Sequence, residues 1–418
     1  IRDLRMSRGL GDVYKRQLVY GALCQVTGRK LPWGDLTGIR PTKIPMKLLE
    51  EGWKNTEIAR YMRETYGVSN EKTALAITIA NREKALLQDL DYENGYSLYV
   101  GIPFCPSICL YCSFGSHPLE RWTKRVEEYL DTLCKELTFI REQMGARKLT
   151  TVYIGGGTPT TLEPEQLRRL LSHIQETFDF TWVKEYTVEA GRPDSITREK
   201  LQVMKEFPVT RISVNPQTMN QKTLDVIGRK HTVEDTVNIF HMARELEFDN
   251  INMDLIIGLP GEGKEEVAHT LQEVEKLHPD SLTIHSLALK RATRLNLFKD
   301  KYEEMSFENS KEIMEMTQQC AGNMGMGPYY LYRQKNIAGN FENVGYAEVD
   351  KAGIYNILIM EEKQTILAAG AGASTKFVFE HGTRIERVEN VKDVNNYILR
   401  IDEMLERKRV GIQKYLNG

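Results

Sequence analysis

The chain has 418 residues, of which 41% are hydrophobic and 27% charged, and its formal net charge is −2. This length is enough to bury a large core in two or three domains, whereas the small net charge excludes a general attraction to nucleic acid or to an anionic membrane. No apolar run approaches the roughly 20 residues that span a bilayer, and the start lacks the pattern of a secretory signal. We therefore expect a cytoplasmic monomer without nucleic-acid or membrane partners.

The first 95 residues are predicted to precede the main fold. Residues 1–17 share no periodicity with the residues after them, and we expect them to be a non-native or truncated leader. Residues 18–95 have apolar side chains three or four apart in MKLLEEGW, EIARYMRETYG and TALAITIANREKALLQDL. This spacing predicts a helical N-terminal segment, with turns at Pro32, Gly34 and Pro41.

From residue 96 short apolar strands alternate with amphipathic helices. The predicted strands are SLYVGI, TVYIGGG, EYTVEA, RISVNP, INMDLIIGLP and SLTIHSLAL, and the predicted helices are 121–144, 164–178, 233–246 and 265–278. Such alternation is typical of parallel strands joined by right-handed crossovers. Residues 96–292 are therefore predicted to form an α/β barrel or open sheet, with active-site residues at the carboxyl ends of its strands.

Beyond residue 292 the alternation stops. The sequence predicts a helix over 306–324, strands at GPYYLYR, GIYNILIM, TILAAG and KFVFE, and a charged helix from 391 to 416. We interpret residues 293–418 as an α+β domain that covers the substrate.

Three of the six cysteines lie within eight residues, in the segment IPFCPSICLYCSF after the first predicted strand. Cys105, Cys109 and Cys112 can direct their thiolates to one centre. Iron-sulfur clusters are normally held by four thiolates, so three ligands leave one iron open to a small molecule such as S-adenosylmethionine. The alternatives are a structural zinc site with His117 as fourth ligand, or simple burial. The remaining cysteines are expected to be packing residues: Cys24, Cys134 and Cys320.

CPSICLYC after one strand and GGGTPT after the next resemble the radical-SAM superfamily. Matches from about residue 99 to 376 narrow the resemblance to the oxygen-independent coproporphyrinogen III oxidase family, and to its HemZ-type branch. The resemblance implies a partial (β/α)6 radical-SAM barrel, a [4Fe-4S] cluster on the three cysteines and bound S-adenosyl-L-methionine. It also implies contacts to S-adenosylmethionine from Tyr99, Tyr111, Gly156, Gly157, Thr158, Glu189, Gln217, Arg229, Asp254, Ala288 and Ser374.

The residue types at these positions suit such contacts. Glycines let the backbone approach a ligand closely, carboxylates suit an ammonium group and ribose hydroxyls, and an arginine suits a carboxylate. Without the cysteines, each side chain would equally serve as a core residue or an anchor of its loop. The chain also departs from the family's pattern. Ser113 and Phe114 stand where some relatives have a fourth cysteine, and Asn215 and Pro216 stand where Gly-Val is common.

The resemblance implies that a flavodoxin or ferredoxin reduces the cluster, which then splits S-adenosylmethionine into methionine and a deoxyadenosyl radical. In that family the radical takes hydrogen from propionates of coproporphyrinogen III, and loss of carbon dioxide and an electron leaves vinyl groups. The product is protoporphyrinogen IX, in porphyrin and haem biosynthesis. Four substrate carboxylates require cations near the barrel mouth, and the candidates are Lys290, Arg291, Arg294, Arg333 and Lys335.

Two alternative functions remain open. The first is a haem-binding chaperone of the same superfamily, which retains the cluster without making protoporphyrinogen. The second is a radical enzyme that acts on haem, as a methyltransferase or in ring opening.

Overall fold

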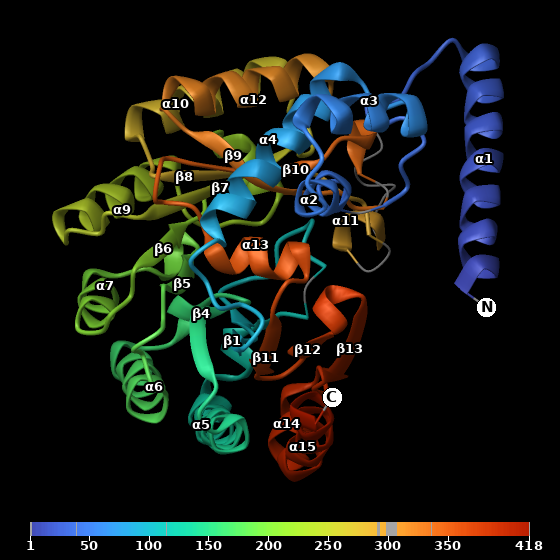
Figure 1. Ribbon diagram of the computed structural model, residues 1–418. Coiled ribbons are helices and arrows are strands. Elements are labelled where there is room, and N and C mark those ends of the chain that lie inside the picture. Colours follow the sequence, from blue (N-terminus) through green and yellow to red (C-terminus); the bar gives the residue numbers. More distant parts are fainter. Residues whose placement is uncertain are drawn as a thin grey trace.

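The structure, a computed structural model, describes residues 2–38, 40–113, 115–290, 293–297, 307–335 and 337–417, with side chains except those of 2–14 and 338. Within these residues one sheet of eleven strands forms the centre of the molecule (Figure 1). Its strand order is β13-β12-β11-β1-β4-β5-β6-β7-β8-β10-β9. The described sheet thus has two edges, β13 and β9.

Six parallel strands form the middle of the sheet and confirm the predicted α/β fold class. They are β1 (Gly95–Ile102), β4 (Lys148–Gly156), β5 (Glu185–Gly191), β6 (Arg211–Val214), β7 (Ile251–Ile257) and β8 (Ser281–Ser286). They follow one another in chain order, as in a partial (β/α)6 barrel. Most of their residues are buried, because helices or loops cover both faces.

Helices line the outer side of this sheet in Figure 1. Those that join the parallel strands are α5 (Val126–Met144), α6 (Pro164–Thr177), α7 (Arg198–Lys205), α8 (Gln221–Val226), α9 (Val233–Glu245) and α10 (Lys264–Leu277). In α5 the buried residues Leu133, Leu137 and Ile140 recur three or four apart, which gives one apolar face. Within the described residues no helix combines the length and apolar composition needed to cross a membrane.

The N-terminal residues form four helices, as predicted for 18–95. They are α1 (Arg2–Thr27), α2 (Lys43–Glu50), α3 (Asn55–Tyr66) and α4 (Asn70–Leu86). Helix α1 stands beside the body of the molecule in Figure 1 and runs across residue 17 without a break, so no change of element marks the predicted end of the leader. Helix α4 is tied to the sheet by Arg82, which donates to the carbonyls of Ala347 and Glu348 at 3.0 and 2.9 Å.

The C-terminal residues extend the central sheet instead of forming a second one. Their strands are β9 (Gly327–Tyr332), β10 (Asn343–Ala347), β11 (Thr365–Ala369), β12 (Ser374–Phe379) and β13 (Arg384–Glu389). Strand β11 pairs parallel with β1, and β10 pairs antiparallel with β8. The predicted boundary at residue 292 therefore separates two parts of the chain that share one sheet.

Two of the C-terminal predictions are wrong in detail. The predicted strand GIYNILIM is helix α13 (Ile354–Glu361), in which Tyr355 and Leu358 are buried together with Ile357. A short apolar run has no period that distinguishes a strand from a buried helix. The predicted charged helix is two helices, α14 (Val394–Leu399) and α15 (Ile401–Asn417), because the backbone angles of Arg400 between them are not helical.

Two further helices precede β9, namely α11 (Arg294–Leu297) and α12 (Lys311–Asn323).

Helix α13 lies against the inner face of the sheet, opposite the outer helices. Its Tyr355 ring stacks on Tyr153 of β4 with 4.4 Å between ring centroids, and lies 6.5 Å from the Tyr99 ring of β1. Such aromatic contacts add to the free energy gained from burying the rings. They fix α13 beside the carboxyl ends of the first parallel strands.

A buried ion pair joins the two C-terminal helices to the outer face. Lys408 of α15 lies 3.0 Å from Glu136 of α5, and both side chains have no exposed surface. The Glu136 carboxylate also accepts hydrogen bonds from Asn390 and Tyr397, and Lys408 donates to the Ala368 carbonyl of β11 at 2.7 Å. This network holds α14 and α15 against the strand that pairs with β1.

We predict that Lys408→Met lowers the free energy of unfolding by roughly 3–5 kcal/mol, because it leaves the Glu136 carboxylate buried without its cation. Chemical denaturation followed by circular dichroism measures the change. Lys414→Met on the same helix is the matched control, since Lys414 is exposed and its partner Glu386 is only half-buried, so the loss of this pair is expected to change little. Equal effects of the two substitutions would contradict this assignment.

Candidate functional site

A cavity of about 460 Å³ lies at the carboxyl ends of the parallel strands. It is lined by nearly all of the residues implied by the resemblance: Tyr99, Cys105, Cys109, Tyr111, Cys112, Gly156, Gly157, Thr158, Glu189, Gln217, Arg229, Asp254 and Ala288. These residues come from all six parallel strands or the loops that follow them. The fold thus brings one predicted set together from positions far apart in the sequence.

The three cysteines reach this cavity on a loop that is held at several points. Cys105 ends a short strand β2 (Phe104–Cys105), which pairs with β3 (His117–Pro118). In the middle of the loop, the Leu110 amide donates to the Ile227 carbonyl at 2.9 Å. Because both ends and the middle are anchored, the loop presents all three thiols to one side.

The donor chemistry of this loop fits an iron-sulfur cluster. Cys105 and Cys109 are buried, and all three thiols line a cavity rather than a packed core. In the part of the chain that the structure describes, no three His, Cys, Asp or Glu side chains meet closely enough to hold a single metal ion. A four-iron cluster binds each thiolate on a different iron, so its ligands are spaced more widely than those of one ion.

His117, the fourth ligand of the zinc alternative, has other neighbours. Its ring packs edge-on against Trp122 with 5.2 Å between centroids, and its Nε2 lies 3.5 Å from the Lys392 carbonyl. It does not line the cavity of the three cysteines. The geometry therefore gives no fourth ligand for a Cys3His site at this position.

The GGG segment after β4 leaves room next to the cysteine loop. A β-carbon on Gly157 would lie 3.0 Å from the Cys105 sulfur and 2.4 Å from the Phe104 carbonyl oxygen. Gly156 has φ of +110°, a conformation that other residues rarely adopt. Only glycines permit this close approach of the two loops, so the segment helps to shape the cavity.

Two buried arginines face the thiol of Cys109. Arg192 is 4% exposed, and its Nη1 lies 3.7 Å from the Cys109 sulfur while it donates to the Ser107 carbonyl at 2.9 Å. The Nη2 atom of the same guanidinium donates to Oδ2 of Asp194 at 2.6 Å. Arg229 also interacts with the Cys109 thiol. The two guanidinium groups thus place positive charge beside a cysteine that is expected to bind the cluster.

Several polar atoms of the cavity wall are buried without a partner. They are Oδ1 of Asn215, Oε1 of Gln217 and Nε of Arg229, and Gln217 has a left-handed φ of 70°. Arg229 is positioned by Nη2, which lies 3.2 Å from the Tyr111 hydroxyl. Buried polar groups are normally paired, so these atoms have hydrogen-bonding capacity that suits a polar ligand.

Two carboxylates face the same cavity in different electrostatic settings. Burial is the largest influence on Glu189 and raises its pKa to about 7, against the hydrogen bond from the Tyr153 hydroxyl, which lowers it. Burial also opposes ionisation of Asp254, but His285, whose Nε2 lies 3.8 Å from Oδ2, and the hydrogen bond that Asn252 donates outweigh burial and lower the pKa. Asp254 is therefore ionised at neutral pH, whereas Glu189 titrates there.

The remaining predicted residues lie elsewhere. Ser374 lines a neighbouring cavity. Arg333 donates to the Leu36 carbonyl at 2.8 Å and packs over Trp33, so its guanidinium is used to join the N-terminal segment. Arg294 and Lys335 do not line the cavity, and Arg291 lies outside the described residues. Lys290 is the one of these candidate cations that lines it among the residues described.

Among the residues of the site that sequence reasoning missed, four make contacts described above: Tyr153, Arg192, His285 and Tyr355. Tyr153 could have been predicted from strand pairing. It lies beside Tyr99 on the neighbouring strand, and paired residues point to the same side of the sheet. The other three belong to no motif. Their places depend on contacts between distant parts of the chain.

The chain is similar to known proteins of one superfamily. A family model described as the radical SAM superfamily matches residues 99–274. The chain is 43% identical over 395 residues to the oxygen-independent coproporphyrinogen-III oxidase-like protein HemZ of Bacillus subtilis, which covers 93% of this chain and 79% of that protein. It is 37% identical over 198 residues to the haem chaperone HemW of the same organism, which covers 47% of this chain and 52% of that protein.

Among solved structures, the coproporphyrinogen III oxidase HemN of Escherichia coli, described as a radical SAM enzyme, has a similar fold. The TM-score is 0.60 at 25% sequence identity, over 77% of this chain and 73% of that one. These similarities confirm the cofactors expected from the sequence, a [4Fe-4S] cluster and S-adenosylmethionine.

We predict that Arg192→Met lowers the reduction potential of the cluster by about 60 mV, the equivalent of one tenfold change in a one-electron equilibrium. The substitution removes an N–H donor and a positive charge beside the Cys109 sulfur, and both stabilise the added electron. A redox titration followed by electron paramagnetic resonance measures the potential of the anaerobically reconstituted protein.

Two further variants are the controls for that titration. Arg192→Lys keeps the charge and should shift the potential less, while Arg198→Met, which removes an exposed partner of Glu245, should leave it unchanged. An unchanged potential in Arg192→Met protein of normal iron content would show that the guanidinium does not act on the cluster.

Proposed function

This chain belongs to the HemZ, HemN and HemW family of the radical SAM superfamily, and from that premise we propose that it is an oxygen-independent coproporphyrinogen III oxidase. The proposed reaction converts propionates of coproporphyrinogen III to vinyl groups and gives protoporphyrinogen IX. Each conversion removes one hydrogen atom, one molecule of carbon dioxide and one electron from a propionate. The observation that carries the proposal is the similarity to the oxidase-like HemZ over 93% of the chain.

When bound, the cluster and S-adenosylmethionine would supply the radical chemistry that removes the hydrogen atom. The residues of the chain would bind and orient. Cys105, Cys109 and Cys112 would hold the cluster and leave one iron for the amino and carboxylate groups of S-adenosylmethionine. Glu189 and Asp254 would accept hydrogen bonds from the amino N–H groups and the ribose hydroxyls, and Arg229 would pair with the carboxylate.

The aromatic rings of the inner face would shield the reaction from water. Tyr99, Tyr153 and Tyr355 form a stack beside the cysteine cavity, and Tyr355 comes from the helix that covers the sheet. A radical in a closed cavity reacts with the bound substrate rather than with solvent. In this proposal a flavodoxin or ferredoxin donates the electron to the cluster, and the protein acts as a monomer in the cytoplasm.

The second candidate function is a haem carrier, because the chain is also similar to the haem chaperone HemW. That similarity covers 47% of this chain, compared with 93% for the oxidase-like relative. We therefore place the oxidase first. A radical enzyme that uses haem as its substrate is a third candidate for the same cofactor site.

One anaerobic assay separates these functions. Reconstituted protein, S-adenosylmethionine, a reductant and coproporphyrinogen III are incubated together, and products are analysed by mass spectrometry. The oxidase is expected to give 5′-deoxyadenosine together with protoporphyrinogen IX. Tight haem binding without turnover would contradict the oxidase in favour of the carrier, and 5′-deoxyadenosine formed only when haem is added would favour the third function.

We also predict that affinity for S-adenosylmethionine falls as the pH drops below 7. Protonation of Glu189, whose burial raises its pKa to about 7, removes the negative charge that would accept hydrogen bonds from the amino group. The affinity should decrease by up to about tenfold per pH unit below the pKa, whereas Glu189→Gln should bind more weakly with a flat profile. Equilibrium dialysis with labelled S-adenosylmethionine measures the affinities of the wild-type protein and of the Glu189→Gln variant at each pH, and Glu234→Gln on the surface is the control.

A wild-type affinity that does not change between about pH 8 and 6 would exclude this role for Glu189.

A further inference from the structure

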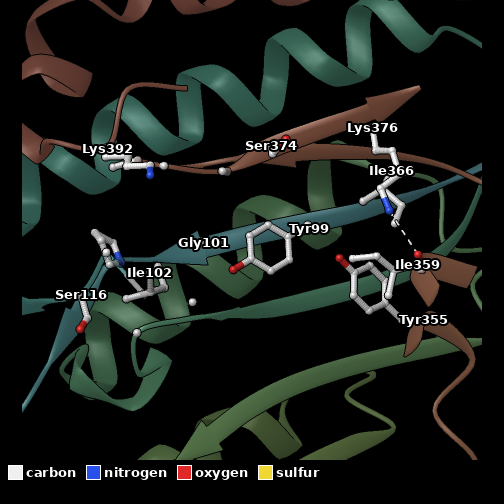
Figure 2. Close-up of a pocket in the computed structure, with 17 residues that line it drawn as sticks. Tyr99, Gly101, Ile102, Ser116, Tyr355, Ile359, Ile366, Ser374, Lys376 and Lys392 are labelled. Carbon is white, nitrogen blue, oxygen red and sulfur yellow. Dashed lines mark hydrogen bonds between the residues drawn. The ribbon is translucent and has the colours of Figure 1, made fainter. Parts of the chain in front are cut away.

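A second cavity, of about 340 Å³, adjoins the cysteine cavity. The two cavities share part of their walls, namely Tyr99, Ser116, Gly156, Gly157, Tyr355 and Ile359. The second cavity lies between β1, the strands β11 and β12 that extend the sheet beside it, and helix α13 (Figure 2). Of the contacts implied for S-adenosylmethionine, Ser374 is the member that lines this second cavity and not the first.

Figure 2 shows how the lining residues are distributed. The rings of Tyr99 and Tyr355 lie in the middle, with Lys392 at one end beside the loop of Ser116 and Lys376 at the other end beside Ile359. Most other lining groups are apolar side chains or small residues. The cavity is therefore an apolar and aromatic space with an ammonium group at each end.

The Lys376 end has more positive than negative charge. Its amine lies 3.6 Å from Glu362 and donates to the Ile359 carbonyl at 3.2 Å. The single Glu362 carboxylate is also paired with Arg40 at 2.8 Å, Lys43 at 2.7 Å and Arg387 at 3.5 Å. Four cations thus share Glu362, of which only 8% of the side chain is exposed, while Arg40 and Lys43 also act on the buried Glu361. An anion that enters the cavity would meet this uncompensated charge.

The Lys392 end is open to solvent. Lys392 is exposed, and no ion pair joins it to a carboxylate in the part of the chain that the structure describes. Its side-chain carbons lie close to Gly372, which places the residue at the rim beside the cysteine loop. A carboxylate could bind there without displacing another partner.

The two cavities therefore differ in charge. Glu189 and Asp254 face the cysteine cavity together with the cations Arg192, Arg229 and Lys290, whereas the described residues that line the second one include two lysines and no Asp or Glu. S-adenosylmethionine carries a sulfonium and an ammonium group, so two lysines without a carboxylate disfavour it. An apolar ligand with carboxylates at its edge is matched on both counts.

We propose that the second cavity binds the carboxylate-bearing edge of the tetrapyrrole substrate, with Lys376 and Lys392 each holding one carboxylate. This assignment rests on the proposed function and names its substrate contacts. The macrocycle edge lies across Tyr99 and Tyr355, and the wall shared with the cysteine cavity lets a further propionate reach the site of hydrogen removal. The cations of the substrate site thus come from the C-terminal strands and the loop after them.

The test uses the anaerobically reconstituted full chain with S-adenosylmethionine bound. The probes are coproporphyrin III, a fluorescent tetracarboxylate, and its tetramethyl ester, which has the same ring without charges. We expect the wild-type protein to bind the tetracarboxylate more tightly than the ester. Lys376→Met and Lys392→Met should each weaken tetracarboxylate binding by about tenfold, as for loss of one charge-assisted hydrogen bond, and leave ester binding unchanged.

Lys363→Met is the matched control, because Lys363 pairs with Glu50 and does not line the cavity. Lys392 is exposed, so its variant retains the fold even if Lys376→Met does not. Equal preference for the tetracarboxylate in wild type and both variants overturns the proposal while leaving the oxidase assignment intact. A loss of bound S-adenosylmethionine in the variants, without a change in porphyrin affinity, also overturns it. A wild-type protein that binds neither probe contradicts the proposed function itself.

Discussion

The proposed chemistry depends on one constraint: three thiols presented by a single anchored loop at the carboxyl end of β1. Three ligands complete the coordination of three irons and leave the fourth open, and an open iron is what lets a cluster bind and reduce a small molecule. The neighbouring features serve the same need. Glycines after β4 let the loop approach closely, and the buried Arg192 and Arg229 place positive charge against Cys109. The close approach of the two loops and the buried positive charge beside Cys109 both suit a negatively charged group bound between the cysteine loop and the glycine segment.

The C-terminal part of the chain converts this centre into a site with two compartments. Strand β11 pairs with β1 and brings β12 and β13 with it, while α13 closes the inner face through the stack of Tyr355 on Tyr153. The cysteine cavity has both carboxylates and cations in its wall, whereas the described residues of its neighbour include two lysines and no carboxylate. In the proposed arrangement a cationic cofactor pairs with the carboxylates of the first cavity, and an anionic substrate pairs with the lysines of the second.

The sequence was a good guide where a local pattern decides the structure. The six parallel strands are short apolar runs bounded by turns, and CxxxCxxC places three ligands in one loop, so both were predictable. GIYNILIM was not, because a buried helix and a buried strand have the same composition over eight residues. The positions of the proposed substrate cations depend on packing between distant segments. Arg333 donates its hydrogen bond to the Leu36 carbonyl of the N-terminal segment, whereas Lys376 reaches the second cavity because β12 pairs with β11 in the sheet.

The most direct test of the central claim is electron paramagnetic resonance of the dithionite-reduced, anaerobically purified protein, recorded with and without S-adenosylmethionine. If one iron lacks a protein ligand, the reduced protein gives the signal of a [4Fe-4S] cluster, and S-adenosylmethionine changes its g values. Label in the amino nitrogen of S-adenosylmethionine then couples to the cluster spin. A cluster signal that S-adenosylmethionine leaves unaltered, or protein that contains zinc and no iron when prepared without air, would contradict the claim.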